Sequence, residues 1–288
     1  MFNWLKRIYF MGLFVLLFQG LLFAGSENNN SHSEELKAIK NLHWIYGPKE
    51  VTLGGIAKFK VPEGYMFLEP ADTAKLMEIY HNPPSYRDEY YFGPKNFKWF
   101  GLFSYEDTGH ISDKEDIDAD SLIENIKEGN EEANKYREEK GWEPIHITGW
   151  RYKPFYDKNT KRLSWAIDAT SGGHLITNYN TRILGRTGVT SAILVVDPDK
   201  LEEVVYPFNE VVNGYEFNND KKYSAFKDGD KVAKYGLAAL IAGGAAAVAT
   251  KKGLWTTLAI AVKAFWKFIL AGIIAFFSFF KNIFRRDD

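Results

Sequence analysis

Cysteine is absent from all 288 residues of the chain. This absence excludes disulfide bonds, thiolate catalysis, cysteine-ligated zinc and lipid attachment to an N-terminal cysteine. The common serine-hydrolase and phosphate-loop motifs, G-x-S-x-G and G-x-x-x-x-G-K-[ST], are missing too. None of the six histidines stands four residues from another, the spacing of a helical zinc site. We therefore expect no cofactor and no metal, and favour a non-catalytic protein.

The net charge of −1 conceals a separation of charge along the chain. Residues 25–250 contain 27 basic and 35 acidic side chains, a net charge of −8, whereas both ends of the chain are basic. Binding to nucleic acid needs a clustered positive surface on the folded domain, which such a composition does not provide. The pattern instead favours a soluble domain between two membrane-interacting ends.

The N-terminus has the order of a secretory signal peptide over residues 1–26. Lys6 and Arg7 form the basic part, residues 8–23 are apolar, and three small residues follow. Cleavage can follow Ala24 or Ser26, and retention as an uncleaved anchor stays open. The next residues, 27–41, are predicted to be a flexible N-terminus.

The C-terminal residues 235–288 are predicted to be a membrane-anchoring helical tail. A bilayer span needs about 20 apolar residues, and the tail contains a short apolar block and a longer one interrupted by Lys263 and Lys267. One span over about 268–284, a hairpin of two spans, or an interfacial helix before a short span all fit. We favour the single span, because it leaves Arg285 and Arg286 in the cytoplasm.

Residues 42–234 are predicted to form an exported α+β domain, with a mainly antiparallel sheet covered by helices. A Gly-Gly turn predicts a hairpin over 51–61, and Asp72 is predicted to cap a helix that reaches Tyr80. Pro83 to Pro94 is expected to be a loop. A long helix is predicted from Asp118 or Asp120 to about Lys140. Further strands are expected at 65–68, 99–105, 145–152, 163–170, 174–184 and 190–196, with a helix over 198–213.

The order of short motifs resembles a bacterial family of predicted membrane-anchored proteins with a domain of unknown function. The resemblance covers roughly residues 42–253. It rests on Trp44, Gly47-Pro48, Ala57 to Tyr65, Gly109-His110-Ile111, Gly149-Trp150, Pro154, Tyr156-Asp157, Leu163 to Ala166, Asn178-Tyr179, Leu184-Gly185-Arg186 and Asp230 to Leu240.

The resemblance implies an exported protein anchored by its C-terminus, and it transfers no activity, cofactor or catalytic residue. The expected location is the bacterial cell membrane, with the globular domain exported. The expected partners are the lipid bilayer and another envelope protein, without nucleic acid. The preferred hypothesis is a non-catalytic binding or assembly module.

One group of residues is predicted to bind a ligand: Asn178, Tyr179, Arg182 and Arg186. Guanidinium groups suit carboxylate or phosphate recognition, so an anionic ligand is the hypothesis. Strand alternation places Tyr179 on the face opposite to Asn178 and Arg182. The alternative is that these arginines make ion pairs with the acidic body.

Two further interpretations remain open. An envelope enzyme could use scattered carboxylates, such as Glu106, Asp107 or Asp113 near His110. The tryptophans Trp150 and Trp165 could be core, or could form an exposed platform for carbohydrate or a partner.

The acidic run from Asp113 to Asp120 does not fit a calcium-binding EF-hand loop. Counted from Asp116, its sixth position is Ser121 rather than glycine and its twelfth is Lys127 rather than glutamate. We interpret the run as a loop that caps a helix.

Overall fold

The computed structural model describes residues 29–80, 85, 87–139 and 143–242, without the side chains of 29–33, 132, 133, 136 and 139. The predicted signal peptide and residues 243–288 of the predicted tail lie outside this range. Across the described part of the chain, no helix has the length and apolar composition that a membrane span requires.

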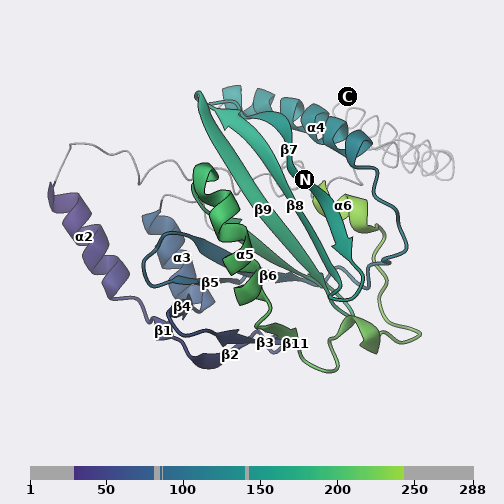
Figure 1. Cartoon of the computed structure of the whole chain (residues 1–288), viewed down its shortest axis with the longest axis horizontal. Coiled ribbons are helices and arrows are strands. Elements are labelled where there is room, and N and C mark those ends of the chain that lie inside the picture. Colours follow the sequence, from purple (N-terminus) through teal and green to yellow (C-terminus); the bar gives the residue numbers. More distant parts are fainter. Residues whose placement is uncertain (1–28, 81–84, 86, 140–142, 243–288) are drawn as a thin grey trace, which may run out of the picture. The chain divides into compact units, whose positions relative to one another are not determined.

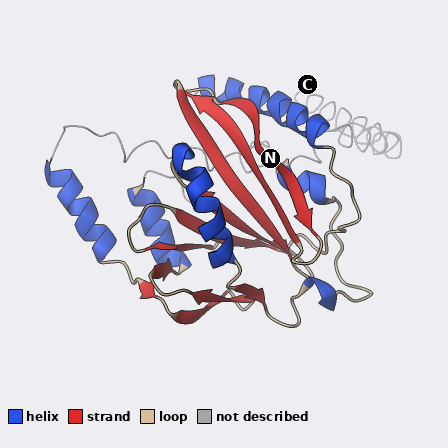
Figure 2. Cartoon of the chain, in the orientation of Figure 1, coloured by secondary structure: helices blue, strands red, loops and turns tan. Residues whose placement is uncertain are grey.

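The fold is α+β and is dominated by an eight-stranded antiparallel sheet (Figure 2). The strand order is β1-β4-β5-β6-β10-β9-β8-β7. The bounds are Ile45–Tyr46 (β1), Tyr65–Leu68 (β4), Glu89–Pro94 (β5), Phe100–Glu106 (β6), His146–Asp157 (β7), Arg162–Ser171 (β8), His174–Leu184 (β9) and Val189–Val195 (β10).

A second sheet and one helix cover one face of the large sheet. The three strands are Lys49–Leu53 (β2), Ala57–Val61 (β3) and Tyr215–Phe217 (β11), in the order β11-β3-β2. Helix α5 (Leu201–Val212) follows a short 3-10 turn, η1 (Pro198–Lys200), and lies across β9 in Figure 1. The core between these layers is rich in aromatic rings, including Phe59, Phe92, Phe103 and Phe208.

Gly101 shows how tightly this aromatic core is packed. Phe92 on β5 lies directly across from Gly101 on β6, and its ring stacks on that of Phe103 with centroids 4.3 Å apart. A Cβ atom added to Gly101 would lie 2.1 Å from the Phe92 ring. The ring therefore occupies the space that any larger residue at position 101 would need.

Three helices pack on the opposite face of the large sheet. Helix α3 (Pro70–Ile79) covers β4 and β5, while α4 (Ala119–Glu139) packs against β7, and α6 (Leu237–Ile241) covers the ends of β8, β9 and β10. Leu237, Leu240 and Ile241 are buried. The first residues of the predicted tail thus belong to the core of the domain. The remaining helices are α2 (Asn29–Lys40), inside the predicted flexible N-terminus, and the 3-10 turn η2 (Tyr223–Ala225).

Most of the elements expected from the sequence are present, with differences of a few residues at their ends. The Gly-Gly hairpin joins β2 and β3, and Asp118 accepts a hydrogen bond from the Ser121 amide (3.1 Å) at the start of α4. Two expectations were wrong. Helix α3 begins at Pro70, so Asp72 lies in its first turn and does not cap it. The expected loop over 83–94 contains strand β5, whose aromatic residues are held by pairing with β4 and β6.

Candidate functional site

The four residues that the sequence predicts as a ligand site lie on two faces of the sheet and in a turn. Asn178 and Arg182 point from β9 toward the face covered by α4 and α6, whereas Tyr179 points toward α5. Arg186 lies in the turn after β9. The alternation expected along this strand is confirmed, and the four side chains do not converge on one point.

Tyr179 is part of the aromatic core. Its ring is buried and meets that of Phe208 edge to face, with centroids 5.8 Å apart. Its hydroxyl accepts a hydrogen bond from the Asn209 side chain on α5 (3.1 Å). These contacts attach α5 to the sheet, which gives Tyr179 a structural role.

Arg186 makes a two-pronged ion pair with Asp230. Its Nε and Nη2 atoms each donate to a different carboxylate oxygen of Asp230, both at 2.7 Å, and Nη1 donates to the Asp220 carbonyl (3.3 Å). The guanidinium holds the pKa of Asp230 down at about 2. For Arg186 the alternative interpretation, an ion pair with the acidic body, is therefore confirmed.

Arg182 lies in a row of polar residues that crosses the middle of the large sheet. Register places Arg182 on β9 beside Ser191 on β10, then Ser104 on β6 and Glu89 on β5. Residues opposite one another in adjacent antiparallel strands share a face, so all four lie on the side of α3, α4 and α6. Together with Arg87 and Glu106 in the neighbouring row, we call these six residues the polar strip.

The carboxylates of the polar strip are already occupied or shielded. Arg87 Nη2 lies 2.9 Å from Glu106 Oε2, and both side chains are about one-third exposed. Burial raises the pKa of Glu89, partly opposed by a hydrogen bond with Ser85 and by the charge of Arg87.

Arg182 has no acidic partner within 4.0 Å among the residues that the structure describes. Its guanidinium carbon lies 4.9 Å from the centre of the Trp165 ring, a cation–π contact. Its one hydrogen bond within the described chain is from Nη1 to the Thr181 carbonyl, and it is long, at 3.4 Å. Burial and the positive charge of Arg87 lower the pKa of Arg182 to about 10, opposed by Glu106.

The guanidinium of Arg182 therefore remains charged at neutral pH, and most of its N–H groups make no hydrogen bond within the described residues. An arginine side chain carries five N–H donors in a planar fork, which suits the two oxygens of a carboxylate or phosphate. The Trp165 ring lies against this guanidinium. This arrangement can bind one small anionic group.

Asn178 shares the face of Arg182 but stands apart from it. The two residues are four positions apart on one strand, which corresponds to about 13 Å along β9. Asn180 lies between them, and its side chain donates to the Asn178 carbonyl (3.4 Å). A ligand larger than a single anionic group is needed to contact both.

The residues suggested for an envelope enzyme are dispersed. Asp107 pairs with Lys231 (3.3 Å), and Asp113 with Lys161 (2.8 Å). His110 directs Nδ1 at the Arg186 carbonyl (3.1 Å), and its ring stacks with Tyr223 and Phe226. No carboxylate approaches the His110 ring among the described residues, so no specific contact favours this alternative.

The tryptophans belong to the core. Trp165 is buried, and Trp150 is half-buried with its indole N–H donating to the Ala119 carbonyl (2.9 Å). The described acidic loop and its surroundings contain no group of three side chains placed to hold a metal ion. Glu115 from this loop instead accepts a hydrogen bond from the Ala238 amide (3.1 Å) at the start of α6.

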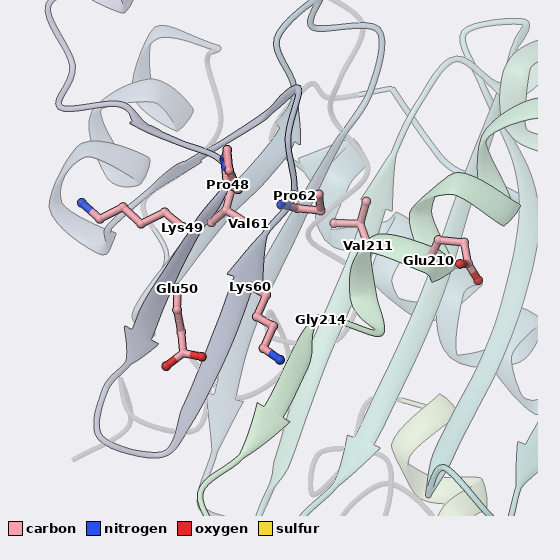
Figure 3. Close-up of a pocket in the computed structure, with 9 residues that line it drawn as sticks. All are labelled: Pro48, Lys49, Glu50, Lys60, Val61, Pro62, Glu210, Val211 and Gly214. Carbon is pink, nitrogen blue, oxygen red and sulfur yellow. The ribbon is translucent and has the colours of Figure 1, made fainter.

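A shallow hollow of about 480 Å³, which the sequence does not indicate, lies beside the small sheet (Figure 3). Three segments distant in the chain form it: residues 48–50, 60–62 and 210–214. Val61, Pro62 and Val211 contribute apolar surface, and Lys60 and Glu210 place opposite charges beside it. Neither charge is buried. The hollow therefore lacks the convergent polar groups that mark a specific ligand site.

The described residues form an α+β domain in which one arginine on the face of the central sheet, Arg182, contacts Trp165 and the Thr181 carbonyl without a carboxylate partner among them. Residues 45–276 match the model of a family described as "Protein of unknown function (DUF2167)". The chain belongs to this family. No curated protein matches it.

Among solved structures, the chain is similar to the solution structure of cyanobacterial PsbP (CyanoP) from Synechocystis sp. PCC 6803. The identity is 9%, the match covers 68% of this chain and 99% of that one, and the TM-score is 0.36. This likeness is remote.

The ion pair of Asp230 predicts how stability responds to acid. A carboxylate whose pKa falls on folding stabilises the folded state above its ordinary pKa of 3.8 and loses that effect as the pH falls to about 2. We expect Asp230→Asn to lower the melting temperature at pH 7 and to match the unsubstituted protein near pH 2. The exposed Asp228→Asn is the control, with little change at either pH. A deficit in Asp230→Asn that persists unchanged at pH 2 would contradict this account.

Proposed function

We propose that this protein is a membrane-anchored envelope protein whose α+β domain is a non-catalytic binding module for an anionic group on another envelope component. The domain is held at the membrane by the C-terminal tail, and Arg182 receives a carboxylate or phosphate of the bound component. Trp165 and the Thr181 carbonyl contact Arg182 in the unbound domain.

The membrane part of the proposal is supported by the two ends of the sequence. Residues 1–26 have the order of a signal peptide, and residues 254–280 contain a long apolar block that carries only Lys263 and Lys267 as charges. A stretch of this length is enough to cross a bilayer. The acidic, cysteine-free body between them is suited to an exported domain.

The binding part of the proposal is carried by the environment of Arg182. Arg182 is half-buried, and a charge that is shielded from water is costly unless it is paired. Arg182 instead has Trp165 and a single long bond to the Thr181 carbonyl. A residue that reduces stability in the unbound domain and has unused donors is typical of a site that is completed by its ligand.

Three other arginines of the domain show the contrast. Arg151 pairs with Asp168 (2.9 Å), Arg87 with Glu106 (2.9 Å) and Arg186 with Asp230 (2.7 Å). Arg162 donates to the Asn213 side chain (2.5 Å) and the Val212 carbonyl (3.2 Å), although its buried Nε has no hydrogen-bond partner within the described residues. Arg182 differs from the three ion-paired arginines because its guanidinium lies against Trp165 without a carboxylate among the described residues.

Substitution of Arg182 tests the binding site. With the full chain in detergent, we expect inorganic phosphate and citrate to bind, with Arg182→Met losing about tenfold or more of the affinity, because charge-assisted hydrogen bonds contribute about 1.5–3 kcal/mol. The control Arg151→Met should retain the affinity. Calorimetric titration measures both.

The same variant distinguishes a binding role from a structural one. Because Arg182→Met removes a half-buried charge that has no carboxylate partner among the described residues, we expect the free energy of unfolding to stay within about 1 kcal/mol or to rise. Equal phosphate affinity in Arg182→Met and the unsubstituted protein, or destabilisation by several kcal/mol, would refute the proposed site.

Fractionation tests the membrane part. With a C-terminal tag, we expect the protein in the membrane pellet after carbonate extraction. Protease added to spheroplasts should remove the domain and leave a tagged tail fragment protected, as a single span requires. Cleavage of the tag from outside would indicate two spans, and an unprocessed full-length protein in the cytosol would overturn the anchoring.

A further inference from the structure

The segment that joins β11 to α6 exposes two large apolar side chains. Phe226 is 37% exposed and Val232 is 58% exposed. Isolated exposed apolar residues are common on protein surfaces, so exposure alone decides nothing. Phe226 and Val232 are of interest because they lie shortly before the predicted membrane-anchoring tail in the sequence.

Phe226 and Val232 belong to one surface because both contact the same residue. The Phe226 ring stacks on the His110 ring with centroids 4.0 Å apart, and Tyr223 stacks at 4.3 Å. Val232 is paired with His110 through its backbone, since the His110 amide donates to the Lys231 carbonyl (2.7 Å) and Ala233 donates to the His110 carbonyl (2.9 Å). We call this surface the Phe226–Val232 patch.

Lysines surround the patch. Lys227 and Lys234 are exposed and make no ion pair within the described residues, and Lys231 keeps 58% of its side chain exposed while pairing with Asp107. Of the acids nearby, Asp230 is neutralised by Arg186, which leaves Asp228 exposed. The patch is thus apolar at its centre and positive around it, although the body of the protein is acidic.

The backbone orients the patch outward. Along 232–235 exposure alternates, with Ala233 and Tyr235 packed against the core of α6, and Val232 and Lys234 on the solvent side. Figure 1 shows this segment, in yellow-green, at the end of β8 and β9 opposite to the hairpin that joins these two strands.

From these observations we infer that the Phe226–Val232 patch rests on the anionic surface of the lipid bilayer that holds the tail. The inference rests on the proposed membrane anchoring. An aromatic and an aliphatic side chain surrounded by lysines is the composition of an interfacial contact, where apolar groups enter the headgroup region and ammonium groups meet anionic lipid.

Chain length supports this occupant. Residues 233–267 lie between Val232 and the favoured span, which begins at about residue 268, and α6 occupies five of them. A linker of this length confines the domain to the neighbourhood of the bilayer that contains the span. A tail in the bilayer therefore keeps the patch close to the membrane surface at a high local concentration, so weak contacts are sufficient.

The absence of cysteine makes a direct test possible. Single cysteines are introduced in the full chain as Phe226→Cys and Val232→Cys and labelled with an environment-sensitive fluorophore. Leu175→Cys and Tyr46→Cys are matched controls, because these side chains are 38% and 53% exposed. Leu175 lies on β9 about 33 Å along the strand from the turn at Gly185.

The labelled proteins are reconstituted into phosphatidylcholine vesicles with and without about 30% phosphatidylglycerol, an anionic lipid. Some vesicles carry spin-labelled acyl chains as a quencher within the bilayer. We expect a blue shift and lipid quenching at positions 226 and 232 and neither at 175 nor 46. We expect the blue shift and the lipid quenching to be larger in the vesicles that contain phosphatidylglycerol. The double variant Lys227→Gln with Lys234→Gln should give the same signals in both kinds of vesicle.

Each other outcome overturns the inference in a distinguishable way. Carbonate-resistant protein whose labels at 226 and 232 are quenched by aqueous iodide and not by lipid overturns the patch alone and leaves the anchoring intact. Protection from iodide without lipid quenching assigns the patch to a contact between copies of this chain and overturns the lipid contact. Loss of the protein from the vesicles on carbonate extraction overturns the anchoring, and the patch with it.

Discussion

Both faces of the large antiparallel sheet are covered, and this constraint governs the rest of the structure. Side chains alternate between the two faces of the sheet. The neighbouring strands β4, β5, β6, β10 and β9 must therefore each supply packing residues to both faces. One face meets a second sheet and α5, and the other meets three helices. A polar side chain at the centre of such a sheet is largely shielded from bulk water, and Arg182, Ser104 and Glu89 are half-buried.

The aromatic content of the chain follows from this constraint. Phe92 stacks between Phe103 and Phe208, with centroid distances of 4.3 and 5.8 Å, and Gly101 leaves room for its ring. Large rings bridge the space between two sheets with few residues. On the opposite face the apolar clusters beneath α3 and α6 are separate, and the polar strip lies between them.

Local sequence signals predict the parts of the fold that depend on neighbouring residues. The Gly54-Gly55 turn, the cap at Asp118 and the alternation along β9 were all predictable, since each is decided within a few positions. The opposite orientations of Tyr179 and Arg182 belong to this group.

Contacts between residues far apart in the chain could not be predicted from the sequence. Arg186 and Asp230 are 44 residues apart, and nothing local shows that one neutralises the other. Arg87 and Glu89 lie in or beside a segment predicted to be a loop, because its prolines concealed strand β5. The polar strip depends on the register of four strands. Arg182 was the one member predicted to bind a ligand, and Glu106 was named only among the scattered carboxylates of the enzyme alternative.

The same distinction separates the two uses of arginine in this domain. Arg186 has a structural role. Its hydrogen bonds to Asp230 and to the Asp220 carbonyl connect the turn after β9 to the segment that leads into α6. Arg182 has no carboxylate partner among the described residues and lies over Trp165. Under the proposed function, this guanidinium is the group that meets an anionic component at the membrane surface.

The most direct test of this account is the pKa of the Arg182 side chain, measured by carbon-13 NMR at its guanidinium carbon with and without inorganic phosphate. The account predicts a pKa of about 10 in the free protein, and an increase when phosphate binds, since a neighbouring negative charge favours the protonated form. A pKa at the ordinary arginine value in the free protein, or one that phosphate leaves unchanged, would contradict it.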